Sequence, residues 1–312
     1  MKVITTMNDN EIAVCGTGLT QEEKHFLTAV ARGQVDKVRT SLQENPALIR
    51  TQEKDIHWPW LGRDALMLAC YYRPNPTMVR LLQSYGADAT LASDEGDHPL
   101  MMLASTKQAI PEDTKEILGQ LVDSLGVQAH TFFTRRTSWR GASKKWTPFL
   151  IAVQNDNLAF VEEYFHQYET KNCLKNKDPD CDQHLYPEGE SALLLAIKNQ
   201  SPGMVKLLLD HRADPNRRRY GDITPLMVLA TLENPQPHAT RQILNMLLDA
   251  GAENITNCFH ETALDMAKEC RNTAFIKTWN ERNTPVPPYV VVAEGCYDQV
   301  PVKFKKQSLQ AK

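Results

Sequence analysis

The chain has 312 residues, of which 42% are apolar and 23% are charged, and its formal net charge at neutral pH is −3. This balance indicates neither a nucleic-acid binder nor an acidic disordered chain. No apolar run reaches the ~18–20 residues of a membrane span, and the N-terminal segment lacks the apolar core of a secretory signal. Seven scattered cysteines, an odd number, indicate free thiols in a reducing, intracellular compartment.

Two short sequence motifs recur along the chain at intervals of about thirty to fifty residues, the pattern of a stacked helical repeat. The first motif is a polar turn followed by a short apolar helix, as in DITPLMVLA at Asp222–Ala230. The second is a longer helix that ends in a turn, as in MVRLLQSYGADA at Met78–Ala89. Thr147 and Thr224, each followed by proline, are expected to cap the first turn of their helices.

The copies divide the chain into three segments. Residues 1–20 form a lead-in, residues 21–283 form an array of about seven repeats, and residues 284–312 form a Pro-containing tail. A polyproline ligand, a strand folded back on the last repeat, a disordered end and a translocation signal all remain open for the tail. One residue in each copy is expected at an equivalent core position: Phe26, Leu66, Leu100, Phe149, Leu193, Leu226 and Leu264.

These copies resemble the ankyrin repeat, whose motif runs Thr-Pro-Leu-His-x-Ala-Ala, then Val-x-x-Leu-Leu, then Gly-Ala-Asp-x-Asn. The resemblance covers roughly residues 22–283 and implies an all-α solenoid of stacked helix-turn-helix units with projecting β-turn or finger loops. It also implies a monomeric, non-catalytic adaptor that binds a protein partner through its fingers and inner helices. Compact ankyrin proteins with short tails further resemble effectors of intracellular bacteria, which act in the cytosol or nucleus of a host cell.

The connection before the fourth copy is the richest candidate for partner contact, with basic and aromatic residues interleaved in TFFTRRTSWRGASKKW at Thr131–Trp146. Aromatic and arginine residues are enriched at binding hot spots. Residues 58–63 and 217–220 form two similar turns. The predicted contacts are Trp58, Trp60, Arg63, Arg135, Arg136, Trp139, Arg140, Lys144, Lys145, Trp146, Arg217, Arg218, Arg219 and Tyr220.

If these turns align, they form a basic, aromatic strip that favours an acidic protein segment. Nucleic acid or an anionic head group is the second candidate, and the acidic net charge argues against nucleic acid. The alternative interpretation is structural: charged turns are solvated, and some of the tryptophans close the core between repeats.

The segment CLKNKDPDCDQHLYPEGE at Cys173–Glu190 leaves a metal-dependent or enzymatic module open as an alternative function. Its aspartate spacing departs from a calcium loop, and a fourth zinc ligand is not evident beside Cys173, Cys181 and His184. A solvated polar loop is the favoured interpretation. No nucleophile motif or phosphate-binding loop is present, so we expect no enzymatic activity and no cofactor.

One modification follows from the resemblance alone. Asn216, in LLLDHRADPN, matches the position at which ankyrin repeats can be hydroxylated by an intracellular asparaginyl hydroxylase, with Leu208 eight residues upstream. The chain would then be a substrate of that enzyme.

Overall fold

The computed structural model describes residues 18–52, 62–93, 96–106, 110–125, 133–135, 144–171, 191–219 and 221–283. Within these ranges the chain forms seven pairs of α-helices. The first helices of the pairs are α1 (Gln21–Ala31), α3 (Ala65–Tyr71), α5 (Pro99–Ala104), α7 (Pro148–Gln154), α9 (Ala192–Lys198), α11 (Pro225–Ala230) and α13 (Ala263–Glu269). The second helices are α2 (Val35–Glu44), α4 (Pro76–Ser84), α6 (Pro111–Leu125), α8 (Leu158–Lys171), α10 (Pro202–Asp210), α12 (Pro237–Asp249) and α14 (Thr273–Asn283).

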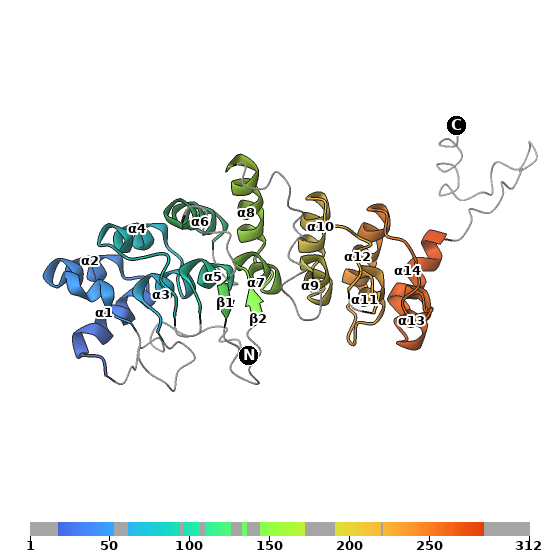
Figure 1. The fold of residues 1–312 in the computed structure, drawn as a ribbon, viewed down its shortest axis with the longest axis horizontal. Helices are drawn as coiled ribbons and strands as arrows, with labels where there is room; N and C mark the ends of the chain where they lie inside the picture. The colour runs from blue at the N-terminus through green and yellow to red at the C-terminus, as the bar shows by residue number, and fades with distance from the viewer. Residues whose placement is uncertain are drawn as a thin grey trace, which may run out of the picture.

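The pairs stack side by side into an elongated array of two layers (Figure 1). The odd-numbered helices form one layer and each contacts the next along the array, while the even-numbered helices form the other layer. A short 3-10 helix, η1 (Pro46–Arg50), follows α2. The predicted all-α solenoid is confirmed.

The helix starts follow from the residues that precede them. The Thr147 hydroxyl accepts a hydrogen bond from the Leu150 N–H at 3.1 Å, and the Thr224 hydroxyl accepts one from the Met227 N–H at 3.4 Å. Each threonine satisfies an amide that has no partner inside its helix, and the proline that follows needs no partner. The predicted caps are therefore confirmed.

The hydrophobic core runs the length of the array and contains six of the seven predicted core positions. Phe26, Leu66 and Leu226 are at most 1% exposed, and the equivalent residues of the third, fourth and fifth repeats are also buried. The residue of the last repeat, Leu264, is only half-buried. No further repeat among the described residues packs against α13.

Asparagine side chains link neighbouring repeats at the turns between paired helices. The Asn272 amide donates to the carbonyls of Leu229 and Ala230 in the preceding repeat, at 3.1 and 3.2 Å, and its oxygen caps the first turn of α14. Asn157 donates in the same way to the carbonyl of Leu103, at 3.2 Å. These buried bonds join the seventh repeat to the sixth and the fourth repeat to the third, and the ankyrin motif histidine is absent from the first helices involved.

A β-hairpin stands between the third and fourth repeats. Its strands, β1 (Phe133–Arg135) and β2 (Lys144–Trp146), are antiparallel, and the register places Phe133 opposite Trp146. Figure 1 shows the hairpin projecting from the layer of odd-numbered helices beside α5 and α7. This is the projecting finger that the resemblance implied.

Candidate partner-binding surface

The hairpin finger, defined as β1 and β2, contains Arg135, Lys144, Lys145 and Trp146 of the predicted contacts. Its register places Arg135 opposite Lys144 and Thr134 opposite Lys145. Residues of like charge directly opposite each other destabilise a strand pair. Arg136, Trp139 and Arg140 lie outside the described residues, as do Trp58, Trp60 and Tyr220.

Arg63 lies in the interior of the array. Its guanidinium lies 2.8 Å from the Asp97 carboxylate, and the two side chains are 3% and 1% exposed. The guanidinium is also 5.6 Å from the centroid of the Tyr71 ring. The prediction of Arg63 as a partner contact is therefore wrong. Asp97 precedes the next repeat, so the ion pair joins two consecutive fingers.

Two further buried polar groups flank this ion pair at the starts of α3 and α5. The Asp64 carboxylate accepts a hydrogen bond from the Met67 N–H at 2.8 Å and caps α3. Burial raises the pKa of Asp64 to about 6, and burial lowers the pKa of His98, the N-cap residue of α5, to about 4. In both groups the interior disfavours the charged form.

The sixth-repeat finger, defined as residues 214–223, keeps its arginines nearer to solvent. The Arg219 N–H donates to the Ile223 carbonyl at 3.0 Å, which closes a small turn. Arg218 lies 3.5 Å from Asp222 of the same turn, and the two side chains are 47% and 50% exposed. Arg218 is therefore accessible to solvent, and its role as a partner contact stays a prediction.

The seventh-repeat finger, defined as residues 254–261, presents an aromatic side chain absent from the predicted contact set. Phe259 is 74% exposed. The buried Asn257 accepts hydrogen bonds from the N–H groups of Phe259 and Glu261, at 2.9 and 3.0 Å, and so fixes the turn. The Cys258 N–H donates to the Gly221 carbonyl of the preceding finger at 3.4 Å. The sequence signal was the aromatic residue in NCFHET, just before the last repeat.

Comparisons with known proteins agree with this geometry. A family model for ankyrin repeats matches residues 108–219 and 149–256. The ankyrin repeat domain of Bcl-3, titled a unique member of the IkappaB protein family, superposes with a TM-score of 0.55 at 21% identity, over 84% of this chain and 99% of that one. The ankyrin repeat domain of human ASB11 gives a TM-score of 0.58 at 18% identity, over 84% and 98%.

The chain contains ankyrin repeats. Its sequence relatives include the regulatory protein NPR5 of Arabidopsis thaliana, 54% identical over 90 residues, or 26% of this chain and 18% of the relative. The BTB/POZ domain and ankyrin repeat-containing protein NH5.2 of Oryza sativa subsp. japonica is 49% identical over 80 residues, or 25% of this chain and 16% of the relative. The match therefore spans less than a fifth of either relative. Ankyrin arrays are in general modules for protein–protein interaction.

Asn216 bridges two neighbouring ankyrin fingers. Its amide donates to the Gly251 carbonyl at 2.9 Å, and its oxygen accepts from the Glu253 N–H at 2.8 Å. These two bonds hold the Asn216 side chain against the turn of the next repeat. Hydroxylation at Asn216 stays a prediction.

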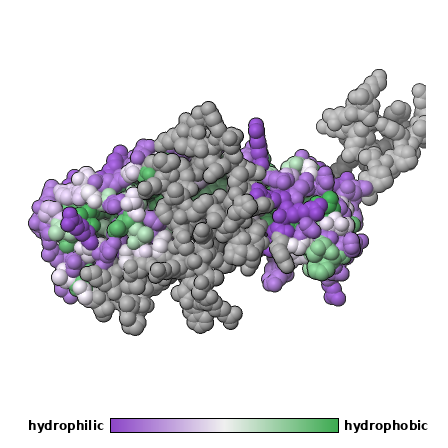
Figure 2. Space-filling view, viewed as in Figure 1, coloured by the Kyte–Doolittle hydropathy of each residue, from purple (hydrophilic) through white to green (hydrophobic). Residues whose placement is uncertain are grey.

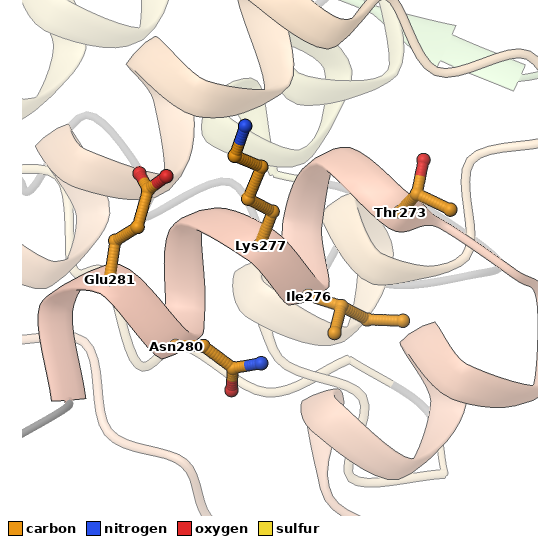
Figure 3. A pocket seen from close by; sticks show the side chains of 5 residues that line it. All are labelled: Thr273, Ile276, Lys277, Asn280 and Glu281. Carbon is orange, nitrogen blue, oxygen red and sulfur yellow. The ribbon is translucent and has the colours of Figure 1, made fainter.

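A shallow pocket of about 510 Å³ lies on the last ankyrin helix, α14. Figure 3 shows its lining: Thr273, Ile276, Lys277, Asn280 and Glu281. All of these side chains come from one helix, and the Lys277 and Asn280 side chains point in different directions. Nothing converges on a bound group, so we do not assign a ligand to this pocket.

No group of three or more His, Cys, Asp or Glu side chains that could hold a metal occurs among the described residues, and residues 173–190 lie outside them. No helix in the described ranges has the length and apolar character needed to cross a membrane. Figure 2 shows a mainly hydrophilic surface over the last repeats, with a small apolar area beside α13.

Proposed function

We propose that this chain is a non-catalytic adaptor that binds a protein partner with an acidic surface through its finger loops. The observation that supports it is the hairpin finger, where β1 and β2 bring Arg135, Lys144 and Lys145 into one strand pair. The surrounding segment, Thr131–Trp146, contains no acidic residue. A cluster of one sign of charge steers an oppositely charged partner and selects against others.

The sixth- and seventh-repeat fingers supply a second contact region for the same partner. Arg218 and Phe259 are both exposed, and the Cys258–Gly221 hydrogen bond holds their turns together. Arginine and an aromatic side chain on a rigid turn are suited to anchor an interface because ordering them costs little entropy. This region extends the proposed surface toward the C-terminal end of the array.

We also propose that the adaptor acts inside the cell as a monomer. Three cysteines of the described residues, Cys70, Cys258 and Cys270, are free thiols, which supports a reducing compartment. Light scattering of the purified chain tests the monomer, and a dimer at micromolar concentration would contradict it. Fluorescence microscopy of a tagged chain in its native cell tests the location.

The decisive experiment compares two charge-reversed chains in affinity purification from the native cell. The finger variant carries Arg135→Glu, Lys144→Glu and Lys145→Glu. The matched control carries Lys37→Glu, Arg39→Glu and Lys206→Glu, which make the same change of charge on exposed positions of α2 and α10. Circular dichroism of both variants is the control for folding.

We expect the finger variant to lose the proteins that the wild-type chain and the control both capture. A folded finger variant that captures the same proteins contradicts the proposed function. Recovery of nucleic acid instead of protein, with binding that weakens steeply as salt rises, would favour the nucleic-acid alternative.

A further inference from the structure

The hairpin finger has two outer edges. Each strand is three residues long, and among the described residues β1 pairs only with β2. An unpaired strand edge carries a row of N–H and C=O groups that can accept another strand. A lone two-stranded hairpin is also marginally stable in water, so a third strand would stabilise it.

The charges of the hairpin finger determine which strand it can accept. Arg135 lies opposite Lys144 in the register, and Lys145 is the next residue of β2. Lysines on an edge strand normally prevent pairing with other chains. They repel basic strands, and they would lose their hydration against neutral ones. An acidic strand reverses this effect, since its carboxylates relieve the repulsion within the hairpin.

We propose that the hairpin finger takes an extended acidic peptide segment of the partner as a third β-strand. The inference rests on the proposed function and names the part of the partner that binds. Backbone hydrogen bonds along the edge would supply affinity whatever the side chains, and the facing pair of Arg135 and Lys144, with Lys145 on the other face of the hairpin, would supply the selection for carboxylates. Such a partner segment is acidic, extended and free of proline at the paired positions.

The test uses three synthetic peptides of about ten residues, long enough for a strand. The first alternates Glu and Val, the second replaces every Val by Pro at the same net charge, and the third replaces every Glu by Lys. Proline has no N–H and cannot enter a strand ladder, so the second peptide keeps the charge and loses the pairing. Binding to the full chain is measured by fluorescence anisotropy.

We expect the Glu-Val peptide to bind about tenfold more tightly than the Glu-Pro peptide, and the Lys-Val peptide not to bind. The finger variant should weaken Glu-Val binding by about tenfold or more, because reversing three charges replaces attraction of the carboxylates by repulsion. The matched control should bind like the wild-type chain. Arg135→Gln, Lys144→Gln and Lys145→Gln together remove the charge without reversing it, and should also weaken binding.

Amide hydrogen exchange provides the structural readout. Bound Glu-Val peptide should slow exchange at residues 133–135 or 144–146, where the new ladder forms. Equal affinity for the Glu-Val and Glu-Pro peptides, or no protection at either strand, overturns the third-strand inference. No binding of the Glu-Val peptide also overturns it, while loss of native partners by the finger variant would still support the proposed function.

Discussion

Arg63 and Arg218 both lie in basic fingers that the sequence marks as partner contacts, yet the array uses them differently. Arg63 pairs at 2.8 Å with Asp97 of the next finger and is 3% exposed, whereas Arg218 lies 3.5 Å from Asp222 of its own turn and is 47% exposed. The position of the acidic partner makes the difference. Asp97 lies in the next repeat, so its ion pair with Arg63 links two repeats and is buried. Asp222 lies in the same turn as Arg218, so this ion pair stays at the surface.

The largest effect is expected when the buried ion pair between Arg63 and Asp97 is broken. Arg63→Ala leaves the buried Asp97 carboxylate without its guanidinium, and removing one member of a buried pair costs about 3–5 kcal/mol. Urea unfolding followed by circular dichroism measures the loss. The double variant Arg63→Met, Asp97→Leu should be much closer to the wild-type chain, because no buried charge remains. A stable single variant would show that Arg63 does not link the two repeats.

The second prediction concerns Asn272, whose side-chain amide links the last two repeats at the other end of the array. Asn272→Ala removes two bonds to preceding carbonyls and the cap of α14, and should lower the free energy of unfolding by about 2–3 kcal/mol. The exposed Asn254→Ala is the matched control, for which we expect a change below about 0.5 kcal/mol. Equal effects of the two changes would mean that the amide links do not hold the repeats together.

The third prediction uses pH to separate the two buried groups beside Arg63. The pKa of Asp64 rises from 3.8 to about 6, so its contribution to stability is present below about pH 4 and is lost as pH rises through 6. The pKa of His98 falls from 6.5 to about 4, so its contribution is present above pH 6.5 and is lost as pH falls through 4. The two contributions oppose each other in this range.

Asp64→Asn keeps a capping oxygen and removes the first of these two titrations. Between pH 6.5 and pH 4 this variant should therefore lose more stability than the wild-type chain, by on the order of 2 kcal/mol. Thermal unfolding across that range measures the difference. Parallel pH profiles for the variant and the wild-type chain would contradict the assigned effect of burial on Asp64.

The smallest effect is expected at the exposed arginine. Arg218→Ala removes a half-exposed ion pair and should change the free energy of unfolding by less than about 0.5 kcal/mol. The same variant should weaken partner capture, because Arg218 belongs to the proposed surface. A large loss of stability would place Arg218 with Arg63 as a structural residue and remove the contrast between the two fingers.

The sequence predicted the parts of the fold that depend on residues close together in the chain. Thr147 and Thr224 cap their helices because a hydroxyl three residues before an amide reaches it by local geometry alone. Leu66 and Leu226 enter the core because apolar residues at helical spacing share one face. The hairpin finger was expected as a projecting turn, and its charge was visible in the segment Thr131–Trp146.

The sequence did not predict features that depend on contacts between repeats. Arg63 was expected at the surface because nothing in GRDALMLAC shows that Asp97 lies beside it. Phe259 was absent from the expected contacts because its exposure depends on the turn that Asn257 organises. The bridging role of Asn272 requires the carbonyls of α11 to lie within 3.2 Å, which only the stacking of two repeats provides.

The sequence by itself determined the ankyrin architecture, since caps, turns and helical periodicity repeat within each unit and act over a few residues. Tertiary structure alone decided the role of each finger residue. An arginine in a finger becomes buried or exposed according to the residue that the neighbouring repeat places beside it, as Arg63 and Arg218 show. The physical reason is that burying a charge is costly unless an opposite charge or hydrogen-bond donors lie within bonding distance, and for Arg63 that distance is set by the packing of repeats.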